Sequence, residues 1–187
     1  MQPRQEKQHY TYADYIMWDD DKWELIDGTP YMMASPSTNR NRISGRLENE
    51  FRNHLRGKTC EVFDAPFDVR LDWAKGDDTV VQPDLLVVCD PNKIDDAGCK
   101  GAPDLIIEVL SPSTAKYDIT TKFTKYRESG VKELWYVDPA IQVVMVRLLR
   151  NGAYVAENYG PTDKITVDIL PELIIDLKDI FDTESTE

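Results

Sequence analysis

A single carboxylate inside an apolar segment places the strongest constraint on how this chain can fold. Residues 105–110 read Leu-Ile-Ile-Glu-Val-Leu, so both faces of the predicted strand are apolar except at Glu108. Such a strand is typical of the centre of a sheet that is covered on both faces. An ionised carboxylate at that depth needs a cation, hydrogen bonds or a raised pKa, because burying it alone is very costly. Glu108 is therefore the first candidate site residue.

The remaining sequence predicts an α/β fold, with a mixed sheet flanked by helices. Apolar residues at every fourth position predict a helix from Arg40 to Arg56. A second helix is predicted from Ser113 or Thr114 to Ser129, with Ile119, Phe123 and Tyr126 on one stripe. Asp27-Gly28 between two apolar runs predicts an N-terminal β-hairpin. Further strands are expected at residues 60–63, 67–71, 80–88 (broken near Pro83), 104–110, 134–137, 143–149, 154–157 and 165–169, and short helices at 11–18 (ended by Asp19-Asp20-Asp21) and 177–181.

Length and composition predict one domain. The 187 residues fit a single unit over residues 10–181, with polar termini at residues 1–9 and 182–187. No apolar run approaches the roughly 18–20 residues that span a bilayer, and the polar N-terminus predicts no signal peptide. Cys60, Cys89 and Cys99 are odd in number and lack CxxC spacing. We therefore expect neither a disulfide framework nor a zinc site, and a reducing, cytoplasmic location.

A second carboxylate, Asp84, follows Pro83 at the start of the apolar run at residues 85–88. If this strand pairs antiparallel with the strand of Glu108, the two carboxylates converge and could share one ion. Hard oxygen ligands favour Mg²⁺ or Mn²⁺ over Zn²⁺. The alternative is that Asp84 caps a turn while Glu108 pairs with a core Arg or Lys. Asp104 is a weaker candidate, because it lies four residues before Glu108, which is roughly 13 Å along a strand and too far to share a metal directly. We expect Asp104 to be a strand-entry residue.

The helix after Thr114 offers a basic partner for these acids. Asp118, Lys122 and Tyr126 recur at a spacing of four, and the Ser-Pro-Ser-Thr turn at residues 111–114 would bring the helix back across the strand. An Asp118–Lys122 pair is equally an ordinary surface salt bridge. No phosphate-binding loop, nucleophile elbow or zinc-protease motif is present. His9 and His54 lie far apart in the sequence, so histidine chemistry has little support.

Four segments in order resemble the Uma2 family, which is placed among the restriction-endonuclease-like PD-(D/E)XK nucleases. The segments are residues 81–88, 101–114, 118–126 and 130–139, supported by residues 24–28 and 35–37. The similarity extends from about Trp23 to Leu149. It implies a restriction-endonuclease-like mixed β-sheet core flanked by helices.

The resemblance also implies a site. It makes Asp84 and Glu108 the acidic metal ligands and the main-chain carbonyl of Val109 a third ligand. Leu110 replaces the usual lysine two residues after the acid, and Lys122 on the following helix takes that role.

Two further residues of the matching segments bear on the implied site. Glu24, in the predicted hairpin, is an additional acidic group of the site. Arg40 stands where relatives often carry a histidine, a departure that puts catalysis in question.

The implied activity is Mg²⁺- or Mn²⁺-dependent hydrolysis of phosphodiester bonds in DNA, with a homodimer expected by analogy. The metal would polarise the phosphoryl oxygen and activate water, while Lys122 orients the water or stabilises negative charge. The alternative is a noncatalytic binding or assembly module that retains the nuclease fold. A glycosidase built on the two carboxylates has no positive support.

The net charge of −12 argues at first against a polyanionic partner, because DNA binding depends on basic groups. Basic residues nevertheless gather at 40–58, with six Arg or Lys against two Glu, and at 116–132, with five against two acids. Such runs are usually solvated helix faces, but both predicted helices flank the implied site. We expect weak, salt-sensitive DNA binding on one face, with a metal neutralising the acidic cleft.

Overall fold

A six-stranded mixed sheet forms the centre of the molecule in a computed structural model that describes residues 8–18, 22–35 and 37–181. Its strands run in the order β12-β11-β10-β9-β6-β3, with β9 and β10 parallel and the other pairs antiparallel. The strands are β3 (Glu61–Asp64), β6 (Leu85–Val88), β9 (Leu105–Val109), β10 (Glu133–Asp138), β11 (Val143–Arg150) and β12 (Ala153–Tyr159).

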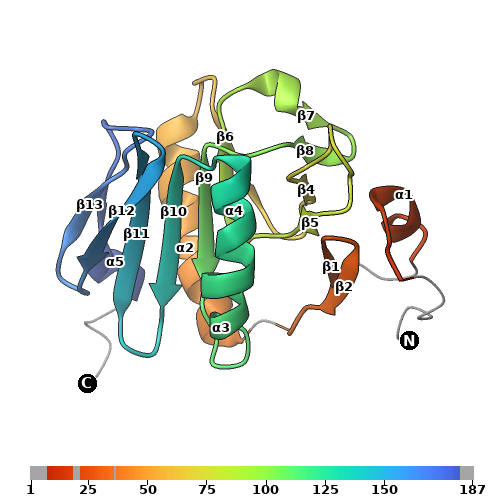
Figure 1. Cartoon of the computed structure of the whole chain (residues 1–187). Coiled ribbons are helices and arrows are strands. Elements are labelled where there is room, and N and C mark those ends of the chain that lie inside the picture. The colour runs from red at the N-terminus through yellow and green to blue at the C-terminus, as the bar shows by residue number, and fades with distance from the viewer. Residues whose placement is uncertain (1–7, 19–21, 36, 182–187) are drawn as a thin grey trace.

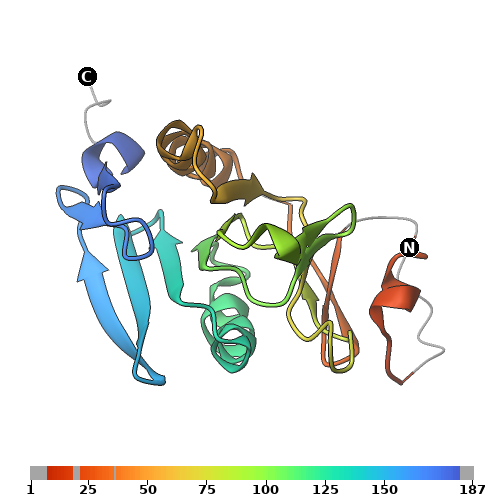
Figure 2. The same ribbon diagram turned by 90° about the horizontal axis from the view of Figure 1, so that it is seen from above.

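Helices cover both faces of this sheet, as Figures 1 and 2 show. Helix α2 (Thr38–Leu55) packs its buried apolar stripe against one face, which carries Leu105, Ile107 and Val109. The opposite face carries Ile106 and packs against α4 (Phe123–Ser129). Because side chains alternate along a strand, Glu108 points to the α4 side with Ile106. The predicted α/β fold, with a mixed sheet between helices, is confirmed.

A second six-stranded sheet contains the N-terminal hairpin and runs in the order β2-β1-β5-β4-β8-β7. Asp27 and Gly28 both have positive φ at the predicted hairpin turn, as a type I′ connection requires. The chain leaves this sheet after Val81 and enters the central sheet at Leu85. The strands are β1 (Trp23–Ile26), β2 (Thr29–Met32), β4 (Val69–Arg70), β5 (Val80–Val81), β7 (Ile94–Asp95) and β8 (Gly98–Lys100), of which β7 and β8 were not predicted.

Smaller elements complete the described chain. The first helix, α1, spans Tyr12–Tyr15, which is shorter than expected, and the tripeptide Asp19-Asp20-Asp21 lies outside the described residues. The predicted helical turn at the end is α5 (Leu177–Phe181). The others are a 3₁₀ turn (Pro91–Lys93) and a two-stranded sheet of β13 (Lys164–Thr166) and β14 (Ile174–Asp176). Within the described ranges, no helix is both long and apolar enough to cross a bilayer.

The helix predicted after Thr114 is interrupted by a π-helical turn, and its buried face differs in part from the expected one. It consists of α3 (Ala115–Tyr117), a π-helical turn (Asp118–Lys122) and α4. The stripe expected for it is wrong at Ile119, which is 43% exposed. Tyr126 is buried as expected, and Asp118 and Lys122, which precede it at a spacing of four, are buried with it.

The expectation that the cysteines do not pair is also wrong, because a disulfide joins Cys60 and Cys89. Cys60 precedes β3, Cys89 follows β6, and the register of these strands pairs Glu61 with Val88. Cys60 and Cys89, one residue beyond this pair, are therefore cross-strand neighbours. Their separation of 29 residues in the sequence does not reveal this. The cysteines thus no longer support the expected reducing location.

Candidate active site

Asp84 and Glu108 meet where the central strands β6 and β9 pair. The pairing is antiparallel, with Leu85 opposite Ile107, so the start of β6 lies beside the end of β9. The main-chain N–H of Val109 donates a hydrogen bond of 2.7 Å to Asp84 Oδ2. Strand register therefore fixes the Asp84 carboxylate next to the residue that follows Glu108.

Lys122 lies between two carboxylates from different sheets. Its Nζ is 2.6 Å from Glu108 Oε1 and 2.9 Å from Glu24 Oε1. Asp118 Oδ1 lies 3.8 Å away, one turn earlier on the same helix. Glu24, Glu108 and Lys122 are each no more than 3% exposed, so the alternative of a surface salt bridge is wrong. Lys122 occupies this buried position as the last residue of the π-helical turn that follows α3.

Three carboxylates around one amine determine the charges in this cluster. Burial alone would lower the pKa of Lys122, but Glu108 and Glu24 outweigh burial and hold that pKa well above its usual value. Lys122 is therefore a charged ammonium. Burial, with a smaller contribution from Glu108, raises the pKa of Asp118 to about 7.

Tyr126 binds the same oxygen of Glu108 that Lys122 contacts. Its hydroxyl donates a 2.6 Å hydrogen bond to Glu108 Oε1, the same oxygen that contacts Lys122. Glu108 Oε2 is buried and has no hydrogen-bond partner among the described residues, and the same holds for Asp118 Oδ2. Buried polar atoms are usually satisfied, so these oxygens are available acceptors. Packing was the expected role of Tyr126, and its bond to Glu108 was missed.

Arg40 occupies the other side of Asp84. Its Nε lies 3.0 Å from Asp84 Oδ1, and its Nη2 lies 2.8 Å from Oδ2. The guanidinium comes from the first turn of α2, where Ser37 Oγ accepts the main-chain N–H of Arg40. Burial and Glu108 raise the pKa of Asp84, and Arg40 only partly counteracts them. The sequence identified Arg40 as a departure from relatives but gave no sign of this pair.

A cavity of about 310 Å³ opens over this cluster. Acidic Glu24, Asp84 and Asp118 line it together with the basic residues Arg40 and Lys122. Its walls come from the hairpin, from the start of α2 and from the helix after β9. Substrate atoms in this cavity would meet both carboxylates and cations.

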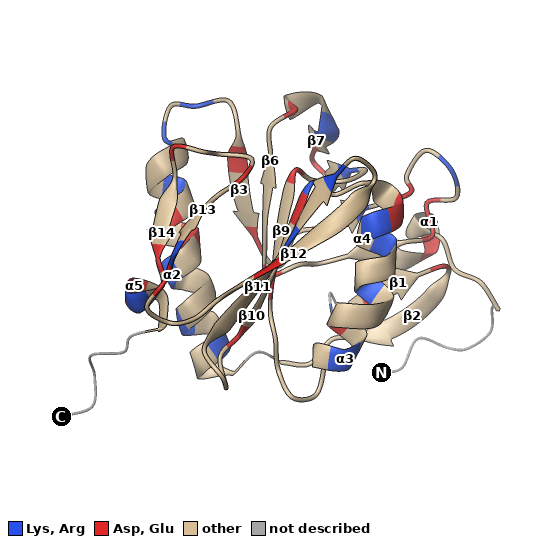
Figure 3. Cartoon of the chain, turned by 60° about the vertical axis from the view of Figure 1, so that its left-hand side comes forward, with Lys and Arg blue, Asp and Glu red and all other residues tan. Residues whose placement is uncertain are grey.

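The two predicted basic runs divide between the site and the surface. Figure 3 shows Lys and Arg on α2 and along the α3–α4 segment, which flank the cluster. Arg40 and Lys122 line the cavity. Others are paired away from it: Arg52 binds Glu48, and Lys58 binds Glu172. Much of each run is thus a solvated helix face, as the alternative held.

The cluster fits a magnesium ion chemically. Carboxylates of Asp84 and Glu108 are hard oxygen donors, and Glu108 Oε2 is a buried acceptor that lacks a partner among the described residues. No group of three or more His, Cys, Asp or Glu side chains in the described part of the chain is arranged to hold a metal. Mg²⁺ commonly uses only one or two carboxylates and completes its coordination with water and substrate phosphate.

The remaining candidates lie outside the cluster. Asp104 accepts a 2.8 Å hydrogen bond from the main-chain N–H of Cys89 and pairs with Lys132 at 2.6 Å. That role matches the strand-start position expected for it. His54 Nε2 lies 2.7 Å from Lys58 Nζ, and His9 pairs with Asp78.

Comparison with known proteins agrees with this architecture. A family model described as "Uma2: Putative restriction endonuclease" matches residues 10–178. The uncharacterized protein slr1290 of Synechocystis sp. is 29% identical over 157 residues, which are 81% of each chain. The uncharacterized protein sll1609 of the same organism is 31% identical over 122 residues, 63% of this chain and 67% of its own.

A solved structure shares the fold. It is described as a "putative nuclease belonging to DUF820" from Anabaena variabilis and is 20% identical to this chain. The two superpose with a TM-score of 0.76 over 92% of this chain and 98% of the other. At that identity the likeness establishes the fold alone.

Proposed function

The chain belongs to the Uma2 family of restriction-endonuclease-like proteins, and on that premise we propose that it is a metal-dependent endonuclease that hydrolyses phosphodiester bonds in DNA. One observation carries the proposal. The buried ammonium of Lys122 contacts Glu108 beside Asp84, at the junction of β6 and β9. Asp84 and Lys122 line the cavity, and Glu108 is buried in contact with Lys122. Together the two acids and the lysine would supply metal ligands and a charge for phosphoryl chemistry.

In the proposed site, Asp84, Glu108 and the main-chain carbonyl of Val109 hold Mg²⁺ or Mn²⁺. When bound, the metal supplies Lewis acidity and lowers the pKa of a coordinated water. The Lys122 ammonium stabilises the negative charge that develops on the phosphoryl oxygens. Tyr126 fixes one oxygen of Glu108, which leaves the other oxygen for the ion.

Glu24 and Arg40 complete the proposed machinery. Glu24 contacts Lys122 at 2.9 Å and keeps its ammonium over the cavity. Arg40 lines the same cavity, and its planar guanidinium matches the geometry of a phosphate. We propose that Arg40, at the wall of this cavity, contacts the substrate phosphate.

One observation favours a second candidate, a noncatalytic module that retains the nuclease fold. Arg40 neutralises Asp84, and Lys122 neutralises part of the charge on Glu108 and Glu24. Internal cations of this kind can stabilise the fold without any metal. The two candidates differ in whether a divalent ion binds and whether DNA is cut.

The proposal includes the molecular context of the activity. One domain, residues 10–181, carries the site, DNA is the substrate, and the active form is a homodimer in the cytoplasm. Sedimentation velocity at several protein concentrations measures the oligomeric state. A monomer at all concentrations would remove the homodimer from the proposal.

The proposed activity is tested by a cleavage screen with Mg²⁺ and Mn²⁺ on supercoiled, linear duplex and single-stranded DNA, with RNA as a comparison. We expect metal-dependent cleavage by the wild type and none by Asp84→Ala. Asp179→Ala removes an exposed carboxylate on α5, away from the cavity, and should cleave like the wild type. Cleavage that persists in Asp84→Ala, or no cleavage by the wild type, favours the noncatalytic module.

A further inference from the structure

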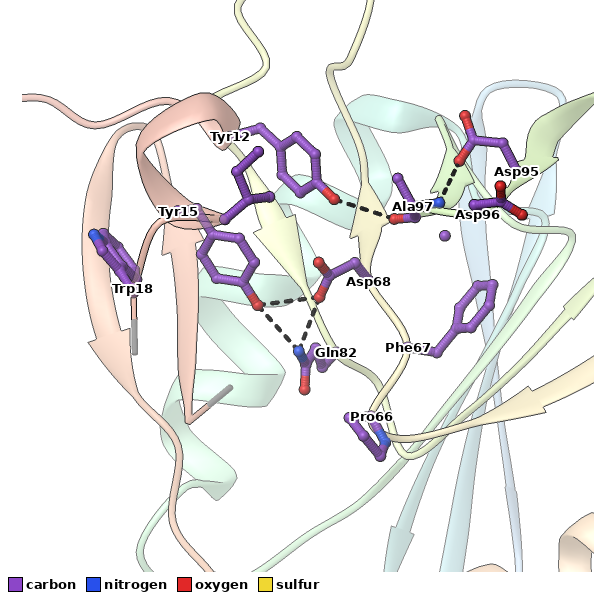
Figure 4. A pocket seen from close by; sticks show the side chains of 12 residues that line it. Tyr12, Tyr15, Trp18, Pro66, Phe67, Asp68, Gln82, Asp95, Asp96 and Ala97 are labelled. Atoms are coloured by element: carbon purple, nitrogen blue, oxygen red, sulfur yellow. Dashed lines mark hydrogen bonds between the residues drawn. The ribbon is translucent and has the colours of Figure 1, made fainter. Parts of the chain in front are cut away.

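A second, larger cavity of about 480 Å³ lies beside the candidate active site. One wall is α1 and the residues after it, and the other comprises residues 66–68 and 95–98 (Figure 4). Four aromatic rings line the cavity, those of Tyr12, Tyr15, Trp18 and Phe67. Its polar lining consists of the amide of Gln82 and the carboxylates of Asp68, Asp95 and Asp96.

Two residues, Pro66 and Gln82, line both cavities. The main-chain N–H of Gln82 donates to Glu24 Oε1 at 2.9 Å on the active-site side. On the side of the larger cavity, the Gln82 side-chain Nε2 donates a hydrogen bond of 2.8 Å to Asp68 Oδ1 and lies 3.0 Å from the Tyr15 hydroxyl. Gln82 and Pro66 thus form the boundary that the two cavities share.

The two cavities differ in charge: the charged residues of the larger one are all carboxylates, whereas the smaller one carries Arg40 and Lys122 beside its carboxylates. Aromatic faces in the larger cavity suit a flat heterocycle, since stacking a base on an aromatic side chain is favourable for every base. Its carboxylates accept hydrogen bonds from amino groups, as Asp and Glu do with the amino group of cytosine, and they repel phosphate. The smaller cavity carries Arg40 and Lys122, which attract phosphate. Together the cavities match a nucleotide, with the base in one and the phosphate in the other.

We propose that the larger cavity binds an unpaired nucleobase that bears an amino group, while a phosphate of the same strand lies in the active-site cavity. This inference rests on the proposed nuclease function and specifies its substrate class. A base in a duplex is stacked and paired, so the substrate is single-stranded DNA or a flipped-out nucleotide. Thymine, which has no amino group, binds less well than cytosine or adenine.

The test measures binding without divalent metal, so that it does not depend on catalysis. Isothermal titration calorimetry with tetranucleotides of deoxycytidine, deoxyadenosine and thymidine gives the affinities. We expect the cytosine and adenine oligonucleotides to bind roughly tenfold more tightly than the thymine one, because a hydrogen bond to a charged group is lost.

Two variants test the lining. Asp96→Asn changes an exposed side chain and should remove most of the base preference. Phe67→Ala should weaken binding of all three oligonucleotides, because it removes a stacking surface. Asp179→Asn makes the same charge change on the exposed face of α5 and should leave the preference intact.

Equal affinity for the three oligonucleotides would overturn the base subsite. So would tight binding of spermidine that displaces the oligonucleotides, which would identify a site for organic cations instead. Base-selective binding without cleavage in any metal supports the subsite and counts only against the nuclease function. Cleavage without base selectivity supports the nuclease function and overturns only the base subsite.

Discussion

Replacing Arg40 by glutamine tests how the protein holds Asp84 before a metal binds. The guanidinium makes contacts of 2.8–3.1 Å with both oxygens of this carboxylate. Both side chains are largely buried, at 15% and 11% exposed. A metal that uses Asp84 must therefore displace Arg40, and the variant removes that competitor.

The size of the effect follows from these contacts. A hydrogen bond to a charged group contributes about 1.5–3 kcal/mol net, and Arg40→Gln removes the charged donor of the pair. Metal binding to the variant should be stronger by about 1–3 kcal/mol, which corresponds to roughly 5–150-fold in Kd. Without metal, the variant should unfold more easily, because Asp84 is left buried without its cation.

Titration calorimetry with Mn²⁺ at pH 8, without DNA, gives the affinity directly. Arg42→Gln is the matched control, because Arg42 is exposed on the same turn of α2 and its loss changes the net charge equally. Urea unfolding should show that saturating Mn²⁺ restores much of the stability that the variant loses. If wild type and Arg40→Gln bind Mn²⁺ equally, Arg40 does not compete with a metal for Asp84 and the reasoning fails.

Three further substitutions probe the buried cluster by urea unfolding. Lys122→Met should destabilise the protein by about 3–5 kcal/mol, since it leaves Glu108 buried without its cation. Lys116→Met, at an exposed position on α3, should cost less than about 1 kcal/mol, and equal losses would contradict the burial argument. Tyr126→Phe keeps the ring but removes the bond to Glu108, and should cost about 1–3 kcal/mol; no loss would mean that the bond is not formed. The pKa of Asp118 is raised to about 7, so the folded protein favours the neutral carboxyl group. The stability that this group contributes is fully present below about pH 4 and is lost as the pH rises through 7. Asn cannot ionise, so the free energy of unfolding of Asp118→Asn should rise by roughly 2 kcal/mol relative to that of the wild type between pH 5 and pH 8. If the difference between the two proteins is the same at every pH, the raised pKa is refuted.

Elements with a local signal could be predicted from the sequence. Asp27-Gly28 specified the hairpin turn, and the four-residue spacing of apolar residues specified α2. Short strands without an apolar run, such as β7 and β8, gave no such signal; β8 also pairs with β4, which lies far away in the sequence, and such a pairing leaves no local pattern. The Cys60–Cys89 disulfide was missed for the same reason: it depends on the pairing of β3 with β6.

Residues of the candidate site were predictable where a charged side chain stands within or next to an apolar strand. Glu108 stood out because it interrupts an apolar strand, and Asp84 because it precedes one. The spacing of four between Asp118, Lys122 and Tyr126 indicated a shared face for Lys122, but it fitted a surface salt bridge equally well. The π turn at residues 118–122 had no signal in the sequence. The Arg40–Asp84 pair depends on how α2 docks over β6, which is a tertiary property.

The central claim is that Glu108 is a ligand in a metal-dependent nuclease site, and Glu108→Gln tests it most directly. This substitution keeps the size of the side chain and an oxygen that can accept the Tyr126 hydrogen bond, while it removes the negative charge. The measurement is the initial rate of Mg²⁺- or Mn²⁺-dependent DNA cleavage by folded wild type and variant under the same conditions. We predict a loss of at least about a hundredfold, because the ion would lose a charged ligand that supports several kcal/mol of charge stabilisation. A wild-type rate in Glu108→Gln would contradict the account.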